Sequence, residues 1–185
     1  MKSLWVLLIF TSVMVHASTL SKAYYAGGCF WGVEYHLEKL KGVKKVESGY
    51  MGGHVKNPTY REVVAHTTGH LETVEVTYDP ALISYETLTK AFFEIHDPTQ
   101  HDGQGPDIGE QYLSAIFVSD EKERRIVRSL IQELNANGYK VATKLLPRSP
   151  FYPAETYHQD YYVKNAKQPY CHAYVKRFKD RENKD

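Results

Sequence analysis

"KAYYAGGCFWGVEYHLEKLKG", residues 22–42, is the stretch that decides how the chain begins to fold. Its first part, up to Gly28, has the pattern of a short strand that ends in a glycine turn. Apolar side chains then recur at helical spacing until a terminating Gly42. These side chains are Phe30, Val33, Leu37 and Leu40. The sequence therefore predicts that Cys29 lies where a strand turns into a helix.

The rest of the chain mixes strand and helix patterns, joined by connections of unequal length. Ser84 and Ser119 are the predicted N-caps of two helices, and Gly138 ends the second. Strands are predicted over 43–53, 71–79, 112–119 and 139–147, and helices over 84–97, 119–138 and 154–165. We therefore expect an α+β fold. It would be a two-layer α/β sandwich with a mixed, mostly antiparallel sheet, a ferredoxin-like core and a long irregular C-terminal segment.

Two long connections, 52–70 and 97–111, contain turn signals at glycine and proline. They are longer than structural connections usually need to be, so we interpret them as walls of a functional site.

The first residues have the pattern of a secretory signal peptide. Lys2 precedes the apolar run 4–15, and the small Ala17 follows it. The run is shorter than the roughly 20 residues of a membrane span; the alternative is an uncleaved anchor or a buried N-terminal helix. We predict a signal peptide over 1–17, a single domain over 18–185, and an exported, periplasmic protein that is not inserted in the membrane after cleavage.

Composition narrows the class of protein. A chain of 185 residues can bury one core, and 42% hydrophobic with 24% charged residues is typical of a globular protein. The formal charge is only +1, and the short basic runs favour solvated faces over a nucleic-acid partner. We expect a monomer.

The chain has two cysteines, Cys29 and Cys171. In an exported protein the default is a structural disulfide, and the rival is a redox pair that opens and closes during turnover. A metal site is disfavoured, because His66 and His70 lie in a glycine-containing loop and no known ligand motif is present.

The residues around Cys29 favour a nucleophile. A helix N-terminus stabilises a thiolate through its free N–H groups and its dipole, and Gly27 and Gly28 would leave the sulfur open to substrate. Consecutive helical residues point about 100° apart, so Phe30 and Trp31 cannot both face one core. At least one of them would form an apolar wall beside the sulfur, suited to a small group such as an S-methyl.

Seven blocks follow one another along the chain: GCFWG, GYMGG, NPTYREV, TGHLETVEVTYDP, IHDPTQ, QGPDIGEQYLSAI and FYPAETYHQDY. Their order and spacing, over about residues 24–171, resemble the A-type peptide methionine sulfoxide reductases. The resemblance implies an enzyme, a peptide-methionine (S)-S-oxide reductase. It would reduce methionine S-sulfoxide, free or in proteins, to methionine and so repair oxidised proteins.

The resemblance implies a role for eight residues. Cys29 would attack the sulfoxide sulfur, and Cys171 would be the single resolving cysteine. Phe30 and Trp31 would hold the methionine methyl group, and Glu72 would hydrogen-bond the sulfoxide oxygen. Three further side chains would line the same oxygen site: Tyr60, Tyr112 and Asp107.

The implied chemistry is coherent on physical grounds. A sulfoxide oxygen leaves only once it is protonated, and Glu72 can supply the proton if an apolar pocket raises its pKa. Attack yields methionine and a Cys29 sulfenic acid, which condenses with Cys171 to a disulfide. An external dithiol, thioredoxin or a thioredoxin-like protein, must reduce that disulfide. No metal or organic cofactor is required.

Two other functions stay open from the residues alone. A secreted binding module would be held by a permanent Cys29–Cys171 disulfide. A thiol peroxidase would need a basic residue beside the peroxide, and none is near Cys29 in the sequence.

The chain also departs from the family pattern. Val64-Ala65, Leu71 and Leu113 stand where other residues are common, which would alter the pocket rim but not its chemical groups. The tail VKRFKDRENKD, residues 175–185, is predicted to be too polar to pack.

Overall fold

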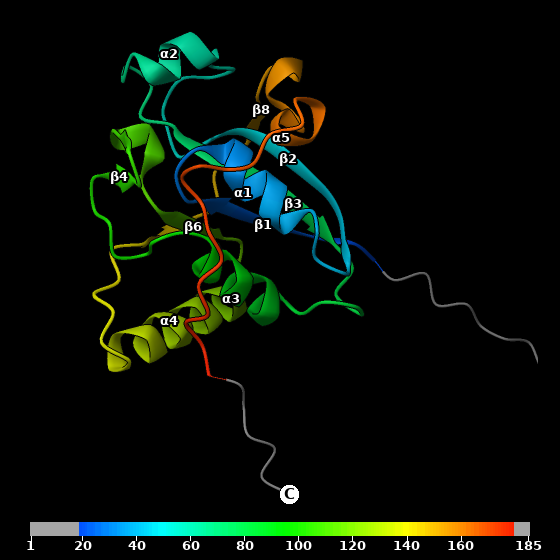
Figure 1. Ribbon diagram of the computed structural model, residues 1–185, viewed down its shortest axis with the longest axis vertical. Helices are drawn as coiled ribbons and strands as arrows, with labels where there is room; N and C mark the ends of the chain where they lie inside the picture. Colours follow the sequence, from blue (N-terminus) through cyan, green and yellow to red (C-terminus); the bar gives the residue numbers. More distant parts are fainter. Residues whose placement is uncertain (1–18, 180–185) are drawn as a thin grey trace, which may run out of the picture.

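The computed structural model describes residues 19–179, so the predicted signal peptide lies outside the described residues. A six-stranded sheet with the order β7-β6-β1-β3-β2-β8 forms the centre (Figure 1). The β6–β7 pair is parallel and the other pairs are antiparallel. Its strands are β1 (Ser21–Ala26), β2 (Val43–Met51), β3 (Leu71–Tyr78), β6 (Ala115–Val118), β7 (Lys144–Pro147) and β8 (Tyr152–Pro153). The predicted α+β class with a mixed, mostly antiparallel sheet is confirmed.

Helices cover the sheet and the ends of its strands. Figure 1 shows α1 in front of β1 and β3, and α3 next to α4, which it contacts. The helices are α1 (Phe30–Leu37), α2 (Tyr60–Val64), α3 (Tyr85–Ile95), α4 (Glu121–Ala136) and α5 (Tyr161–Lys164). Within residues 19–179, no helix has the length and apolar character needed to cross a membrane.

The alternation of β1 shows how the core is divided. Ala23 and Tyr25 belong to the large cluster beneath the helices, whereas Tyr24 and Ala26 belong to a smaller cluster on the opposite face. Successive strand residues point to opposite faces, so a strand apolar at every position is buried on both sides. This strand leads directly to Cys29.

The α3 cap is as predicted, and the α4 cap is one residue away from the prediction. Ser84 accepts a hydrogen bond from the Thr87 N–H at 3.0 Å. Asp120, rather than Ser119, accepts from the Glu123 N–H at 2.8 Å. Serine and aspartate are comparable N-caps, so the pattern could not distinguish two adjacent candidates.

Both long connections contain short elements that the sequence did not predict. Thr59 and Glu62 form a capping box that starts α2. The second connection pairs β4 (Gly103–Gln104) with β5 (Asp107–Ile108) and continues into a 3₁₀ turn, η1 (Glu110–Tyr112). The helix predicted over 154–165 is instead a 3₁₀ turn, η2 (Thr156–His158), and α5, interrupted at Asp160, whose φ is +54°.

The prediction that the tail is too polar to pack is wrong for its described part. We call residues 171–179 the C-terminal strap. The Val175 N–H donates to the Glu94 carbonyl at 2.7 Å, and the Arg177 N–H donates to the Glu94 carboxylate at 3.1 Å. Phe178 is only 5% exposed and packs against Phe93. The aromatic Phe178 and the hydrogen bonds to Glu94 thus dock a segment of polar composition.

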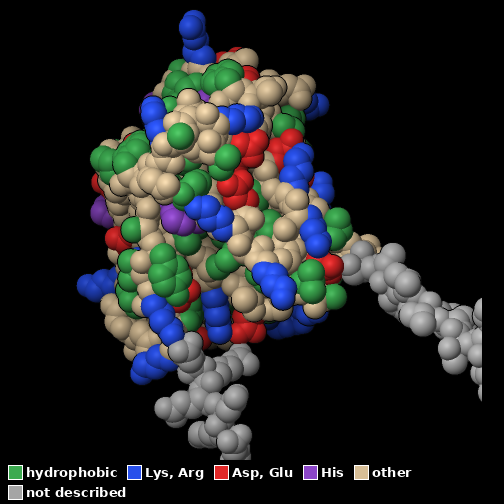
Figure 2. Space-filling view, turned by 45° about the vertical axis from the view of Figure 1, so that its right-hand side comes forward, with side chains coloured by type: hydrophobic (Ala, Val, Ile, Leu, Met, Phe, Trp, Pro, Cys, Tyr) green, Lys and Arg blue, Asp and Glu red, His purple; other side chains and the backbone are tan. Residues whose placement is uncertain are grey.

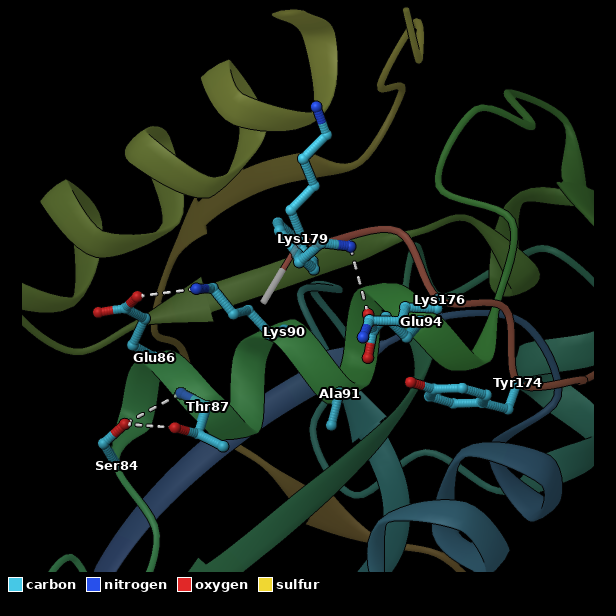
Figure 3. A pocket seen from close by; sticks show the side chains of 10 residues that line it. Ser84, Glu86, Thr87, Lys90, Ala91, Glu94, Tyr174, Lys176 and Lys179 are labelled. Atoms are coloured by element: carbon cyan, nitrogen blue, oxygen red, sulfur yellow. Dashed lines mark hydrogen bonds and ion pairs between the residues drawn. The ribbon is translucent and has the colours of Figure 1, made fainter. Parts of the chain in front are cut away.

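Figure 3 shows the shallow pocket between α3 and the strap, lined by Lys90 and Glu94 on the helix and by Tyr174 and Lys176 on the strap. None of its lining residues belongs to the predicted site. On the face seen in Figure 2, Lys and Arg side chains are distributed among acidic and apolar ones rather than gathered in one patch.

Candidate active site

Cys29 is the N-cap residue of α1 and directly follows the turn after β1, so the predicted strand–helix junction is confirmed. Its side chain is 7% exposed and its thiol is free. The sulfur therefore lies at the positive end of a helix but is largely screened from water.

Glu72 lies on β3, beside the first turn of α1. The Phe30 N–H donates a hydrogen bond to Glu72 Oε2 at 3.0 Å, and the side chain is 2% exposed. Burial raises the pKa of Glu72 to about 8, opposed by the Phe30 N–H and reinforced by the charge of Asp107. The carboxyl group is therefore mainly protonated near neutral pH, as the sequence reasoning required of a proton donor.

Tyr60 at the start of α2 and Tyr112 at the end of η1 bring their hydroxyl groups together. Burial, followed by the nearby charge of Glu72, raises the pKa of Tyr60 to about 12 and also raises that of Tyr112. Both phenols therefore keep their protons at neutral pH and can donate hydrogen bonds to an oxyanion.

Asp107 on β5 is held by an exposed tyrosine. The Tyr170 hydroxyl lies 2.8 Å from Asp107 Oδ1 and 3.0 Å from Oδ2. The charge of Asp107 reaches Glu72 and Cys171, where it favours protonation. Asp107 thus acts on the site electrostatically while its oxygens interact with Tyr170.

The two aromatic residues after Cys29 have different environments. Phe30 is buried, and Trp31 is half-buried with its ring stacked on Tyr161 at a centroid distance of 3.6 Å. The Trp31 Nε1–H donates to His158 Nδ1 at 3.1 Å. The expectation that both rings could not face one core is met only in part, because Trp31 is the more accessible ring but packs against the edge of the cluster that contains Phe30.

His158 and Glu155 are parts of the site that the sequence reasoning missed. His158 is 1% exposed and packs against Phe30, Trp31 and Tyr60, with the Tyr60 ring centroid at 4.4 Å. Glu155 accepts hydrogen bonds from the Tyr60 N–H and from the Tyr50 hydroxyl, each at 2.9 Å. Both lie in FYPAETYHQDY, one of the seven blocks that carry the family resemblance. No pattern in the sequence links either residue to Tyr60.

The two cysteines lie close enough to share a hydrogen bond. That bond, together with burial and the charge of Glu72, raises the pKa of Cys29. The same bond and the neighbouring His172 lower the pKa of Cys171 to about 6, although burial opposes the shift. The expected stabilisation of a Cys29 thiolate by the helix N-terminus is therefore outweighed in the resting pair, whose charge is favoured on Cys171.

The glycines of the motif serve a purpose other than the expected one. A Cβ on Gly27 would lie 2.7 Å from the Phe92 ring, and one on Gly28, whose φ is +93°, 2.4 Å from Gln104. A Cβ on Gly32 would lie 2.2 Å from His172 Nδ1. These glycines admit neighbouring side chains of the protein against α1, rather than leaving the sulfur open.

The histidines considered as metal ligands are not gathered into a site. His70 accepts from the Gly53 N–H through Nδ1 and contacts the Val55 carbonyl through Nε2, so both ring nitrogens are engaged by backbone. Among residues 19–179, no three His, Cys, Asp or Glu side chains are arranged to hold a metal ion.

Comparison with known proteins adds an independent finding. The family model described as "Peptide methionine sulfoxide reductase" matches residues 21–185. The "Peptide methionine sulfoxide reductase MsrA" of Thermus thermophilus is 50% identical over 147 residues, which are 79% of this chain and 84% of that protein.

Two solved structures have the same fold. Reduced Mxr1 from Saccharomyces cerevisiae matches with a TM-score of 0.78 and 32% identity, covering 86% of this chain and 93% of that one. Methionine sulfoxide reductase A of Corynebacterium diphtheriae matches with a TM-score of 0.72 and 37% identity, covering 80% and 76%.

Glu72→Gln should flatten the pH dependence of stability. The folded pKa of about 8 lies above the ordinary value of 4.5, so the stabilisation is complete below the ordinary value and is lost as the pH rises through the folded value. The variant lacks this loss and gains stability relative to the unmodified protein as the pH rises through that window. Denaturant unfolding under reducing conditions measures it.

Glu34→Gln is the matched control for that measurement, because burial raises the pKa of Glu34 to about 8 as well. Each substitution should remove its own part of the slope. An unchanged slope in Glu72→Gln would contradict the assignment.

Gly32→Ala should be destabilising only while His172 is present. In the unmodified protein the new methyl group meets the His172 ring, which should cost about 1–3 kcal/mol. With His172→Ala the space is free, and alanine in a helix should then be favourable by about 0.5–1 kcal/mol. Urea unfolding of the four proteins of this cycle gives the coupling. An equal cost in both backgrounds would mean that the clash is with another group.

Proposed function

The chain belongs to the peptide methionine sulfoxide reductase family, and we propose how its own residues perform the thiol-dependent reduction of methionine sulfoxide to methionine. The observation that carries the proposal is the meeting of a thiol, a mainly neutral buried carboxyl group and two phenols beside an aromatic wall. Membership of this enzyme family sets aside the binding module and the peroxidase.

In the proposed complex the S-methyl group lies against Phe30 and Trp31, and the sulfoxide oxygen faces Glu72 and the two phenols, Tyr60 and Tyr112. Cys29 attacks the sulfoxide sulfur while Glu72 gives its proton to the oxygen. The sulfur–oxygen bond of the substrate then breaks and the hydroxyl group passes to Cys29, so that methionine leaves and Cys29 becomes a sulfenic acid. Its own burial, reinforced by the charge of Asp107, keeps Glu72 mainly protonated for this step.

The nucleophile obtains its charge from the cysteine pair. In the resting state the negative charge is favoured on Cys171, so transfer of the Cys29 proton to Cys171 produces the attacking thiolate without a charge entering from solvent. Cys171 is then a thiol and must be deprotonated before it resolves the sulfenic acid. The step ends in a Cys29–Cys171 disulfide and one water.

The disulfide must be reduced from outside the chain. We propose a thioredoxin or a thioredoxin-like dithiol protein, since thiol–disulfide exchange needs only an attacking thiolate. No further cofactor is part of the proposal. We further propose that the protein prefers the S epimer, that it acts on both free and protein-bound sulfoxide, and that it is a monomer.

We also propose that the sheet and its helices contain a ferredoxin-like core. The succession β1-α1-β2-β3-α3-β6, with the sheet order β6-β1-β3-β2, supports a ferredoxin-like core within a two-layer sandwich.

The epimer assay tests the function. Purified protein with dithiothreitol should reduce the S epimer of methionine sulfoxide and leave the R epimer intact. Cys29→Ser should abolish turnover, because the variant lacks the thiol that attacks the sulfoxide sulfur. Cys171→Ser should still release one methionine per chain in the absence of reductant. Failure to reduce the S epimer, or full activity of Cys29→Ser, would refute the proposal.

We propose export to the periplasm on the basis of the sequence 1–17, and the family match begins after it, at Ser21. Expressed in a bacterium with a periplasm, the full chain should be found there with Ser18 as its first residue. Mass spectrometry of the fractionated protein measures both. A variant with Ala17→Arg should stay uncleaved, because the cleavage site requires a small residue; an intact Met1 in the unmodified chain would contradict cleavage.

A further inference from the structure

His172 is a buried imidazole that the mechanism above does not use. It is 5% exposed and lies on the strap, directly after Cys171. Its Nδ1 lies 3.1 Å from Cys171 Sγ, and its Nε2 lies 2.7 Å from the Gly27 carbonyl oxygen. The ring is wedged against α1, where any side chain at position 32 would collide with it.

The Gly27 carbonyl decides which nitrogen carries the proton. A carbonyl oxygen can only accept a hydrogen bond, so Nε2 must carry the hydrogen. In the neutral ring Nδ1 is then a bare acceptor directed at the Cys171 sulfur. The geometry is that of a base already aligned with the thiol it would deprotonate.

Two further histidines lie near the His172 ring. They are His36 on α1 and His96 at the C-cap of α3. Burial lowers the pKa of both, that of His96 to about 3, so near neutral pH they carry no charge that would oppose a charge on His172. The other titratable groups around Cys171 and His172 are thiol, carboxyl or phenol groups. They are Cys29, Glu72, Asp107, Tyr162 and Tyr170.

We propose that His172 is the general base of the resolution step: it takes the thiol proton of Cys171, and the thiolate then attacks the sulfenic acid on Cys29. The proposal rests on the proposed function. A sulfur–sulfur bond forms and the Cys29 sulfur–oxygen bond breaks. The leaving hydroxide takes a proton from solvent, and His172 returns its proton to solvent, so one water is released. The sulfenic sulfur is reduced and the Cys171 sulfur is oxidised, without an outside oxidant.

The test separates the two chemical steps in a single turnover. Reduced protein is mixed with methionine S-sulfoxide without reductant, and samples are acid-quenched over time. Chromatography measures methionine, and alkylation followed by mass spectrometry measures the free thiols lost to the disulfide. The measurement is repeated from pH 6 to pH 9.5.

His172→Gln can still donate to the Gly27 carbonyl but cannot accept a proton. At pH 7 its disulfide formation should be about 30-fold slower, because an unassisted thiol with a pKa near 8.5 is only about 3% ionised there. The rates of variant and unmodified protein should converge towards pH 9.5, where the thiol ionises without help. His101→Gln, a substitution of an exposed histidine outside the site, is the matched control and should behave as the unmodified protein.

The outcomes separate the two hypotheses. A missing methionine burst in the unmodified protein would refute the proposed function. A normal burst with disulfide formation in His172→Gln as fast as in the unmodified protein at pH 7 would overturn the role of His172. Disulfide formation that is slower by the same factor at every pH would also overturn it, because His172 would then position the strap rather than accept a proton.

Discussion

The hydrogen bond from the Phe30 N–H to Glu72 Oε2, 3.0 Å long, joins the first turn of α1 to β3 at the place where water is excluded. It gives the buried carboxyl group one hydrogen-bond donor. This donor lowers the pKa of Glu72 by less than burial raises it, so the pKa stays above its ordinary value. The bond also sets the distance between that carboxyl group and Cys29, the residue before Phe30. The proposed proton donor and the proposed nucleophile are therefore held next to one backbone group.

Close packing around α1 organises the rest of the site. Because positions 28 and 32 have no side chain, Gln104 and His172 can lie against this part of the chain. Gln104 brings the connection that contains β4, and His172 brings the strap that contains Cys171. The Gln104 side chain donates to the Cys171 carbonyl at 3.3 Å, and the strap is held further along by Glu94. Cys171 lies close to Cys29 because the glycines at positions 28 and 32 leave room for the strap.

The sequence reasoning succeeded where the signal was local or belonged to an ordered set of motifs. The strand–helix junction at Cys29 followed from glycines and periodicity, and the α+β class followed from alternating patterns. It failed where two neighbours were chemically equivalent, as at Ser119 and Asp120, and where short elements depend on tertiary contacts, as in β4 and β5. It also missed α2, although the capping box of Thr59 and Glu62 is a local signal. The docked strap was missed because a polar composition does not reveal that Phe178 and Glu94 meet.

The sequence by itself determined which reactive groups the chain contains. They are Cys29 at a predicted helix start, Cys171 near the C-terminus, and the motif residues Glu72, Tyr60 and Tyr112. Only the tertiary structure decided which of them meet and in which protonation state. The charge of the resting cysteine pair is favoured on Cys171 because the hydrogen bond between the two thiols raises the pKa of Cys29 and lowers that of Cys171. Glu72 lies beside Cys29, whereas His172 supports Cys171. Such preferences depend on burial and on distances between residues far apart in the chain, and no pattern of neighbouring residues encodes them.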